Sequence, residues 1–297
     1  MAHSDDSTDK SGDSPVGFAF AISAYFLWGF LPLYMKALSH VPAAEIVAHR
    51  VIWSIPIAGL VLIFLRRTND IKVALTTPKM LAMGCVTAVL ISLNWGIYVW
   101  AISAGHTLDA ALGYYINPLL SVFLGFALLK EKLTRLQWAA IALAVAAVVV
   151  LTIDAGRLPL VSIAVSLTWG FYALFKKALP IGPNQGFLLE VLILAIPAIG
   201  YLIYIGSNGI SHFSGNVWLL VGCGVVTAVP LMLFANGAKR LRMTTTGILQ
   251  YIAPTLIFLV AVFVFGEPFG TAHAIAFPMI WAALILYTYS MVRSRGQ

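Results

Sequence analysis

The chain has 297 residues, of which 61% are hydrophobic and only 10% are charged, and its formal net charge is +7. An ordinary soluble domain has about 25% charged residues, so this chain has too few to cover a surface in contact with water. Together with a mean hydropathy of +0.94, the composition excludes a soluble protein and predicts an integral membrane protein. The positive charge does not indicate a nucleic-acid partner, because it is distributed over short segments between apolar runs.

The first fifteen residues, MAHSDDSTDKSGDSP, are polar and acidic. They lack the basic stretch and short apolar core of a signal peptide. We therefore expect residues 1–15 to be a disordered cytoplasmic tail, with residues 294–297 as a second tail, and we expect the first apolar run to direct membrane insertion.

Ten apolar runs follow along the chain, each long enough to approach the ~20 residues that a helix needs to cross the hydrocarbon core. None has the alternating pattern of a β-barrel strand, so an all-α integral membrane fold is predicted. The predicted spans are 17–38, 43–65, 79–103, 107–129, 134–153, 158–178, 185–206, 215–237, 245–265 and 270–291.

Lysine and arginine set the expected orientation of these spans, because cytoplasmic loops are enriched in both. If the spans alternate in direction, fifteen of the cations fall on one side, which we predict to be cytoplasmic together with both termini: Lys10, Arg66, Arg67, Lys72, Lys79, Lys130, Lys132, Arg135, Lys176, Lys177, Lys239, Arg240, Arg242, Arg293 and Arg295. The opposite side has only Lys36 and Arg157, and Arg50 lies inside the second span.

An internal repeat divides the chain into two halves, residues 16–154 and 155–293, of five spans each. The halves share short motifs in the same order: FLWGF at 26–30 with LTWGF at 167–171, SIPIAG at 54–59 with AIPAIG at 195–200, VTAV at 86–89 with VTAV at 226–229, and YINP at 115–118 with YIAP at 251–254. Because five is odd, the second half enters from the opposite side of the membrane. The prediction is two inverted five-helix repeats, an architecture typical of secondary transporters.

The repeated proline, Pro118 in the fourth span and Pro254 in the ninth, removes one helical hydrogen bond. The carbonyls of Tyr114 and Gln250 are then free, and a free carbonyl at membrane depth must face protein or a wet cavity. We expect both spans to kink beside a central polar cavity. The alternative is a kink that serves packing alone, since prolines are common in membrane helices.

Several long stretches resemble the RarD proteins, which belong to the EamA branch of the drug/metabolite transporter superfamily. The stretches are AEIVAHRVIWS at 44–54, LNWGIYVWA at 93–101, ALGYYINPLLSVFLG at 111–125, LKEKLTRLQWAA at 129–140 and TTGILQYIAPTLIFLVAVFVFGEPF at 245–269. The resemblance covers about residues 15–290. It implies a ten-helix fold of two inverted EamA repeats in a bacterial inner membrane, and the export or permeation of small molecules.

Aromatic and amide side chains inside the spans are the candidates for a substrate-binding cavity, because they offer flat apolar faces and a few hydrogen-bonding groups. They are Trp28, Asn94, Tyr98, Tyr114, Tyr115, Asn117, Trp169, Tyr172, Asn236, Gln250 and Tyr251. The alternative is that the aromatics belong to the core or the interfacial belt and that the amides hold helices together.

A charged cluster, Glu45, His49 and Arg50, lies in the first two turns of the second span. Glu45 and His49 are four residues apart and are expected to face each other. Charge at membrane depth usually faces the protein interior, so the cluster is a candidate for proton coupling or gating, with Glu190 as its repeat-related partner. The alternative is that Arg50 is a permanent brace between helices.

A repeated glutamate, Glu131 and Glu267, ends the fourth and ninth spans. We expect both to hold the turns to the next spans, and gating of each mouth is the alternative. No cluster has metal-ligand spacing and no phosphate-binding loop is present, so we expect no metal and no cofactor.

The function that this sequence favours is a secondary transporter of small amphipathic organic metabolites or drugs, working by alternating access, with coupling to protons left open. A channel or uniporter is the main alternative, and a membrane enzyme is less favoured because no catalytic cluster is found. The expected partners are a small-molecule substrate and the lipid bilayer. The sequence leaves open whether the chain acts alone or as a homo-oligomer.

Overall fold

A computed structural model describes residues 14–65, 68–129, 133–156, 158–238, 240–241 and 249–293. These residues form helices and their connections, and no strand occurs among them. The predicted tails fall outside the described residues, except that α1 already begins at Pro15.

The described helices follow the apolar runs closely. In the first half they are α1 (Pro15–Ala37), α2 (Ala43–Phe64), α3 (Asn69–Thr76), α4 (Pro78–Ser103), α5 (Thr107–Leu129) and α6 (Arg135–Ala155). In the second half they are α7 (Leu160–Ala178), α8 (Pro183–Ser207), α9 (Val217–Ala238), α11 (Ile252–Leu259), the π-helix η1 (Val260–Val264) and α12 (Thr271–Arg293). Each of the ten predicted ranges thus contains a helix.

Local signals set several helix ends. Proline occupies the first helical position of α1, α4 and α8, where its missing N–H is not needed. α6 begins with a capping box, in which the Thr134 hydroxyl accepts from the Gln137 backbone N–H at 3.3 Å and the Gln137 side chain accepts from the Thr134 N–H at 2.8 Å. It ends at Gly156, whose φ of 62° is the left-handed conformation that favours glycine.

The short helix α3 was not predicted. It is too short to cross a membrane, but its Ile71 and Ala74 are buried against neighbouring helices. These two apolar contacts anchor an amphipathic turn in a segment that the charge pattern alone indicates as a loop.

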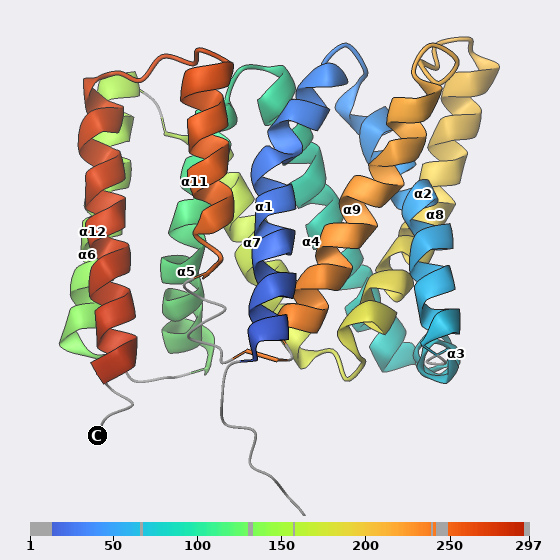
Figure 1. Ribbon diagram of the computed structural model, residues 1–297, viewed down its shortest axis with the longest axis horizontal. Helices are drawn as coiled ribbons and strands as arrows, with labels where there is room; N and C mark the ends of the chain where they lie inside the picture. Colours follow the sequence, from blue (N-terminus) through green and yellow to red (C-terminus); the bar gives the residue numbers. More distant parts are fainter. Residues whose placement is uncertain are drawn as a thin grey trace, which may run out of the picture.

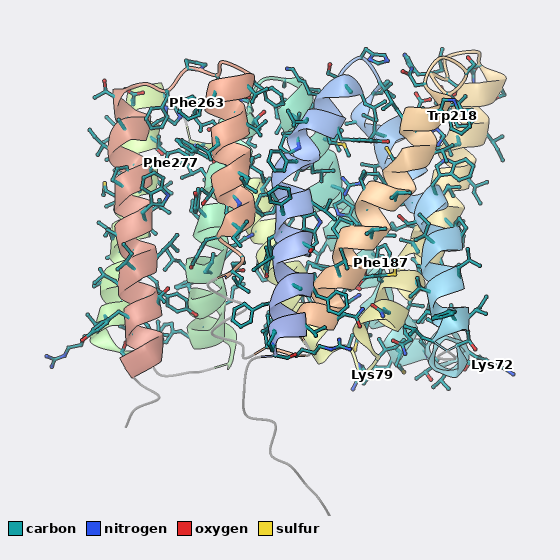
Figure 2. The ribbon with its side chains drawn as sticks, viewed as in Figure 1. Lys72, Lys79, Phe187, Trp218, Phe263 and Phe277 are labelled. Carbon is teal, nitrogen blue, oxygen red and sulfur yellow. The ribbon has the colours of Figure 1, made fainter. Side chains whose placement is uncertain are left out.

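Seven of the helices are long and apolar enough to cross a membrane: α1, α2, α4, α6, α8, α9 and α12. Two shorter apolar stretches, Leu160–Lys176 and Ile252–Val264, accompany them. Large apolar side chains point outward from the bundle, including Trp218 at 87% exposure and Phe263 at 77% (Figure 2). Such a surface is unfavourable in water and suits contact with lipid, so the fold is that of a multi-pass membrane protein.

The helices stand side by side in a bundle that is wider than it is deep (Figure 1). α6 and α12 lie at one side, α1 stands near the centre, and α2 and α8 lie at the other side. α1 begins and α12 ends at the edge that also has α3, Lys72 and Lys79, called here the lower end (Figure 2). The α1–α2 and α8–α9 connections lie at the opposite edge, called the upper end.

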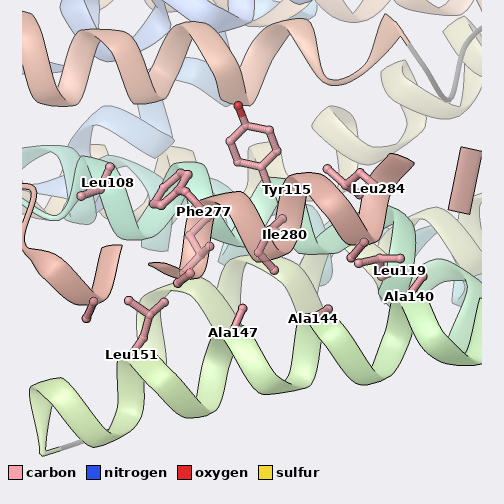
Figure 3. Packing of buried hydrophobic residues seen from close by; sticks show 14 of the residues in the cluster. Leu108, Tyr115, Leu119, Ala140, Ala144, Ala147, Leu151, Phe277, Ile280 and Leu284 are labelled. Atoms are coloured by element: carbon pink, nitrogen blue, oxygen red, sulfur yellow. The ribbon is translucent and has the colours of Figure 1, made fainter. Parts of the chain in front are cut away.

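Contacts between the two halves are extensive. α1 packs on α9 and α11, α7 packs on α4 and α5, α2 packs on α8 and α9, and α6 packs on α12. The last pair is built on small residues, since Ala140, Ala144, Ala147 and Leu151 place one face of α6 against α12 (Figure 3). Small side chains allow helix backbones to approach closely, which drives helix association where water supplies no hydrophobic effect.

Glycines permit close approach at two other crossings. A Cβ added at Gly29 of α1 would lie 2.5 Å from the Leu256 side chain of α11, and one added at Gly170 of α7 would lie 2.8 Å from the Leu120 side chain of α5. By contrast, a Cβ at Gly59 or Gly200 meets nothing within 4 Å.

The two repeat-related prolines have different surroundings. Pro118 is buried inside α5, which continues as an α-helix on both sides of it. Pro254 lies in the first turn of α11 rather than in the middle of a helix as expected, and α11 passes into the π-helix η1 after two turns. Residues 242–248, which include the first four residues of the predicted ninth span, lie outside the described residues.

Candidate functional site

A cavity of about 90 Å³ lies inside the bundle between the two halves. Its lining residues come from α1, α2, α4 and α5 of the first half and from α7, α9 and the α11 region of the second half: Tyr25, Trp28, Leu31, Arg50, Asn94, Trp95, Tyr98, Tyr114, Asn117, Trp169, Thr227, Leu231, Gln250, Ala253, Pro254 and Ile257. A water molecule needs ~10–15 Å³ by this measure, so the cavity has room for roughly six waters or a small polar group.

Aromatic rings form most of the wall. The repeat-related Trp28 and Trp169 contact each other edge to face, with ring centroids 6.4 Å apart. Tyr114 packs on Trp169 at 6.2 Å and on Tyr98 at 5.9 Å, again edge to face. This geometry is favourable between aromatic rings, and it gives the cavity a set of flat apolar surfaces in fixed orientation.

Asn94 joins the two halves beside the cavity. Its side-chain nitrogen donates to the Val165 carbonyl at 3.1 Å and to the Thr168 hydroxyl at 3.0 Å, both on α7. Its side-chain oxygen accepts from the Tyr114 hydroxyl at 3.1 Å. The amide is fully buried, and these bonds tie α4 to α7 and hold the Tyr114 ring in place.

Arg50 supplies the positive charge of the cavity wall. Its side chain is only 3% exposed, its guanidinium lies over the Trp95 ring at 4.6 Å, and its Nε donates to the Thr227 hydroxyl at 2.9 Å. The Thr227 hydroxyl in turn donates to the Cys223 carbonyl at 2.7 Å. Arg50 Nη1 has no hydrogen-bond partner within the described part of the chain.

Near the upper end, Glu45 links α2 to the segment before α9, and its side chain is 1% exposed. Its carboxylate accepts from the Ser211 hydroxyl at 3.1 Å and from the His212 backbone N–H at 2.8 Å, and it lies 2.8 Å from His212 Nδ1. The Glu45 carboxylate thus bonds Ser211 and His212 and not His49, with which the sequence predicted a pair. His49 instead receives the Trp53 indole N–H at 3.2 Å and stacks on Phe213 at 5.1 Å, while its Nε2 has no partner in the described residues.

The lower end has a buried ion pair between α7 and α8. Lys176 Nζ lies 2.6 Å from the Glu190 carboxylate, which is 1% exposed, and the Tyr172 hydroxyl donates to the same carboxylate at 3.2 Å. Side-chain contacts therefore link helices at both ends of the bundle. Glu45 links α2 to the segment before α9 at the upper end, and Glu190 links α8 to α7 at the lower end.

Glu267 serves as a helix cap. Its two carboxylate oxygens accept from the Thr107 and Leu108 N–H groups at 2.9 and 2.8 Å, at the beginning of α5. A carboxylate at a helix N-terminus satisfies free donors and complements the helix dipole. The role is structural, but the carboxylate bonds the beginning of α5 and not the turn to the tenth span that the sequence predicted. Glu131 lies outside the described residues.

Comparisons with known proteins identify relatives of this chain among membrane transporters. Residues 15–153 match the EamA-like transporter family. The chain is 42% identical to an uncharacterized transporter of Vibrio cholerae, covering 95% of this chain and 94% of that one, and 39% identical to protein RarD of Escherichia coli, covering 93% and 95%. The chain belongs to the EamA-like transporter family, among its RarD-like members. It is therefore a membrane transporter.

A solved structure supports the fold of this RarD-like chain. The match has a TM-score of 0.59 and covers 91% of this chain and 96% of the other, whose title describes it only as a crystal structure of a protein. Since the two sequences are 21% identical, this likeness concerns the fold alone.

Four of the cavity residues predicted for the RarD-like chain lie elsewhere. Tyr115 is buried against Phe277 (Figure 3) and bonds Thr255 at 2.7 Å. Tyr251 packs against the same core cluster. Asn236 donates to the carbonyl one turn earlier in α9, at 2.8 Å. Tyr172 contacts the Trp169 ring but directs its hydroxyl to Glu190. The other seven predicted residues line the cavity: Trp28, Asn94, Tyr98, Tyr114, Asn117, Trp169 and Gln250.

Other lining residues of the RarD-like cavity were not predicted, notably Tyr25, Trp95 and Thr227. Tyr25 lies three residues before Trp28, on the same face of α1, so helical spacing alone was a usable signal. Thr227 lies in the second VTAV motif, which we used only to align the halves. Arg50 was predicted to serve coupling or gating, or to be a brace between helices, and the structure brings it into the cavity wall, where it bonds Thr227 of α9.

Proposed function

We infer that this transporter is a carrier that moves small amphipathic organic molecules across a bacterial inner membrane by alternating access. The observation that carries this proposal is the position of the cavity. It lies between the two predicted halves, and the repeat-related Trp28 and Trp169 meet across it. A cavity at a repeat interface is where a carrier binds its substrate.

The packing of the helices supports two inverted halves. Exchanging α1 with α7, α2 with α8, α4 with α9, α5 with α11 and α6 with α12 converts each main contact into another that is present. The contact of α1 with α9 becomes that of α7 with α4, α1 with α11 becomes α7 with α5, and α2 with α9 becomes α8 with α4. The contacts of α2 with α8 and of α6 with α12 map onto themselves.

A side-chain detail obeys the same exchange. Gly29 approaches Leu256, and their repeat-related counterparts Gly170 and Leu120 approach each other. This equivalence supports ten membrane crossings in two five-helix repeats, with α5, α7 and α11–η1 completing the set. The lower end, with Lys72 and Lys79, is then cytoplasmic, as are both termini.

Contacts at the two ends of the bundle favour a carrier over a channel. Glu45 links α2 to the segment before α9 at the upper end, and Lys176 pairs with Glu190 at the lower end. The cavity between them holds only about 90 Å³, well below the ~300–1,000 Å³ of a typical ligand site. We interpret this as an occluded conformation, from which breaking either set of contacts opens one side.

Counterflow in proteoliposomes tests the proposal. Vesicles loaded with an unlabelled compound are diluted into the labelled one, with aromatic carboxylates, amino acids and chloramphenicol as the first compounds and with or without a pH gradient. A carrier gives saturable uptake that the internal compound accelerates.

Matched tryptophan variants locate the path. Trp28→Ala should lower the rate at least tenfold because it removes a cavity wall, whereas Trp218→Ala, on the outer surface, should leave it unchanged. Non-saturating flux without counterflow would indicate a channel. Equal rates for the two variants would show that the cavity is not the path.

A further inference from the structure

The guanidinium of Arg50 is a buried positive charge that forms no ion pair with any residue the structure describes. Arginine stays protonated in proteins, so burial does not neutralise it. None of the residues that line the cavity is an aspartate or a glutamate, and no ion pair within the described ranges includes Arg50. An unpaired charge at membrane depth costs several kcal/mol, which an anion bound beside it would offset.

Two contacts fix the position of the Arg50 guanidinium beside the cavity that this residue lines. Stacking on Trp95 fixes the plane of the group, and the Nε–Thr227 hydrogen bond fixes its rotation. Nη1, which is buried, is then left without a partner in the part of the chain that the structure describes. The Tyr98 hydroxyl, on the wall of the same cavity, is also buried and unpartnered there.

We propose that Arg50 Nη1 and the Tyr98 hydroxyl form a subsite for the carboxylate of an organic acid, with its flat apolar body against the aromatic wall. Two donors that have no protein acceptor match the acceptor-only chemistry of an ionised carboxylate, which forms strong charge-assisted bonds with arginine. One cation neutralises one charge, so the site selects monoanions over dianions.

The rings define the rest of the ligand. Trp28, Trp169 and Tyr114 lie edge to face around the cavity and present apolar surface to an aromatic or flat aliphatic group. In the present conformation the cavity accommodates little more than the carboxylate itself, so a larger acid enters when one end opens. This inference rests on the proposed function, because it names the substrate class of the same cavity.

Matched acid and amide probes test the subsite by binding, without transport. The full-length protein in phosphatidylcholine nanodiscs is titrated at pH 7.5 with phenylacetate and with phenylacetamide, and likewise with indole-3-acetate and its amide, by isothermal titration calorimetry. We expect each acid to bind about 10- to 100-fold more tightly than its amide, as for one charge-assisted pair that is lost. Arg50→Gln should remove the difference, and Tyr98→Phe should reduce it.

Two controls keep the result interpretable. Arg135→Gln, a substitution of the same kind at an exposed position on α6, should preserve the preference for the acid. Arg50→Lys keeps the charge and should retain part of the preference. If Arg50→Gln does not fold, the acid-to-amide ratio of the unmodified protein still decides. Acids that bind within twofold of their amides, no binding of either acid, or a preference that survives in Arg50→Gln would overturn the subsite.

Counterflow with the same probes separates the two proposals. Saturable exchange of the amides at the rate of the acids would overturn the carboxylate subsite and leave the carrier intact. Acid-selective binding that Arg50 controls, with no counterflow of any probe, would support the subsite and contradict the carrier.

Discussion

Replacing single glycines by alanine tests the helix packing at repeat-related positions. Gly29→Ala places a methyl group 2.5 Å from Leu256 Cβ, a contact that α1 and α11 relieve only by moving apart. Overpacking of this kind costs ~1–3 kcal/mol, and alanine recovers ~0.5–1 kcal/mol of helix propensity, so we expect a net loss of ~1–2 kcal/mol. Gly170→Ala meets the far end of the Leu120 side chain at 2.8 Å, and because that end can rotate we expect a smaller loss of ~0–1 kcal/mol.

The chain supplies its own controls for this series. Gly59 and Gly200 are also repeat-related and helical, and a Cβ at either position has nothing within 4 Å. Alanine there should stabilise the protein by ~0.5–1 kcal/mol, because only the propensity term remains.

The assay is unfolding by SDS in mixed micelles, followed by tryptophan fluorescence. Removing the opposing Cβ in Gly29→Ala/Leu256→Gly should give a coupling energy of opposite sign to the Gly29→Ala loss. A Gly29→Ala protein as stable as Gly59→Ala would refute the close approach of α1 and α11. The same result would also contradict the equivalence of the α1–α11 and α5–α7 crossings.

Three further substitutions test the ion pair of Glu190, the helix cap formed by Glu267 and the role of His49. Lys176→Met leaves the buried Glu190 carboxylate with one hydrogen-bond donor and should lower the free energy of unfolding by ~3 kcal/mol in the same assay. Lys176→Met/Glu190→Met should recover most of that loss, and no recovery would contradict a buried pair. Glu267→Ala leaves two N–H groups of α5 without acceptors and should cost ~1–2 kcal/mol, seen as faster hydrogen exchange in the first turn of α5; unchanged exchange there would rule out the cap. If His49 couples transport to protons, His49→Gln should make counterflow independent of an imposed pH gradient, and gradient dependence that persists would remove His49 from coupling.

Much of the helical framework could be predicted from the sequence, since the length of each apolar run is set by the membrane. The two tryptophans of the repeated WGF motif both line the cavity, as expected from their position in the middle of two apolar runs. Asn94 was also found, because an amide at membrane depth needs a protein partner.

The wrong predictions about cavity side chains have one physical cause. In a helix that is apolar on every side, periodicity does not tell the cavity face from the core face, so Tyr114 and Tyr115 are indistinguishable although they point ~100° apart. Hydrogen-bond partners that are distant along the chain could not be predicted from the sequence either. Glu45 looked like the i,i+4 partner of His49, but its acceptors are used by Ser211 and His212, more than 160 positions away.

Sided chemical labelling can detect alternating access. A cysteine at Leu31, on the cavity wall, is placed in a Cys85→Ser/Cys223→Ser background and treated with a membrane-impermeant thiol reagent from either side of oriented vesicles. Adding Glu190→Gln weakens the contact at the lower end. If the transporter works by alternating access, the labelling rate then rises from the cytoplasmic side and falls from the opposite side. A rise from both sides, or no labelling from either, would contradict it.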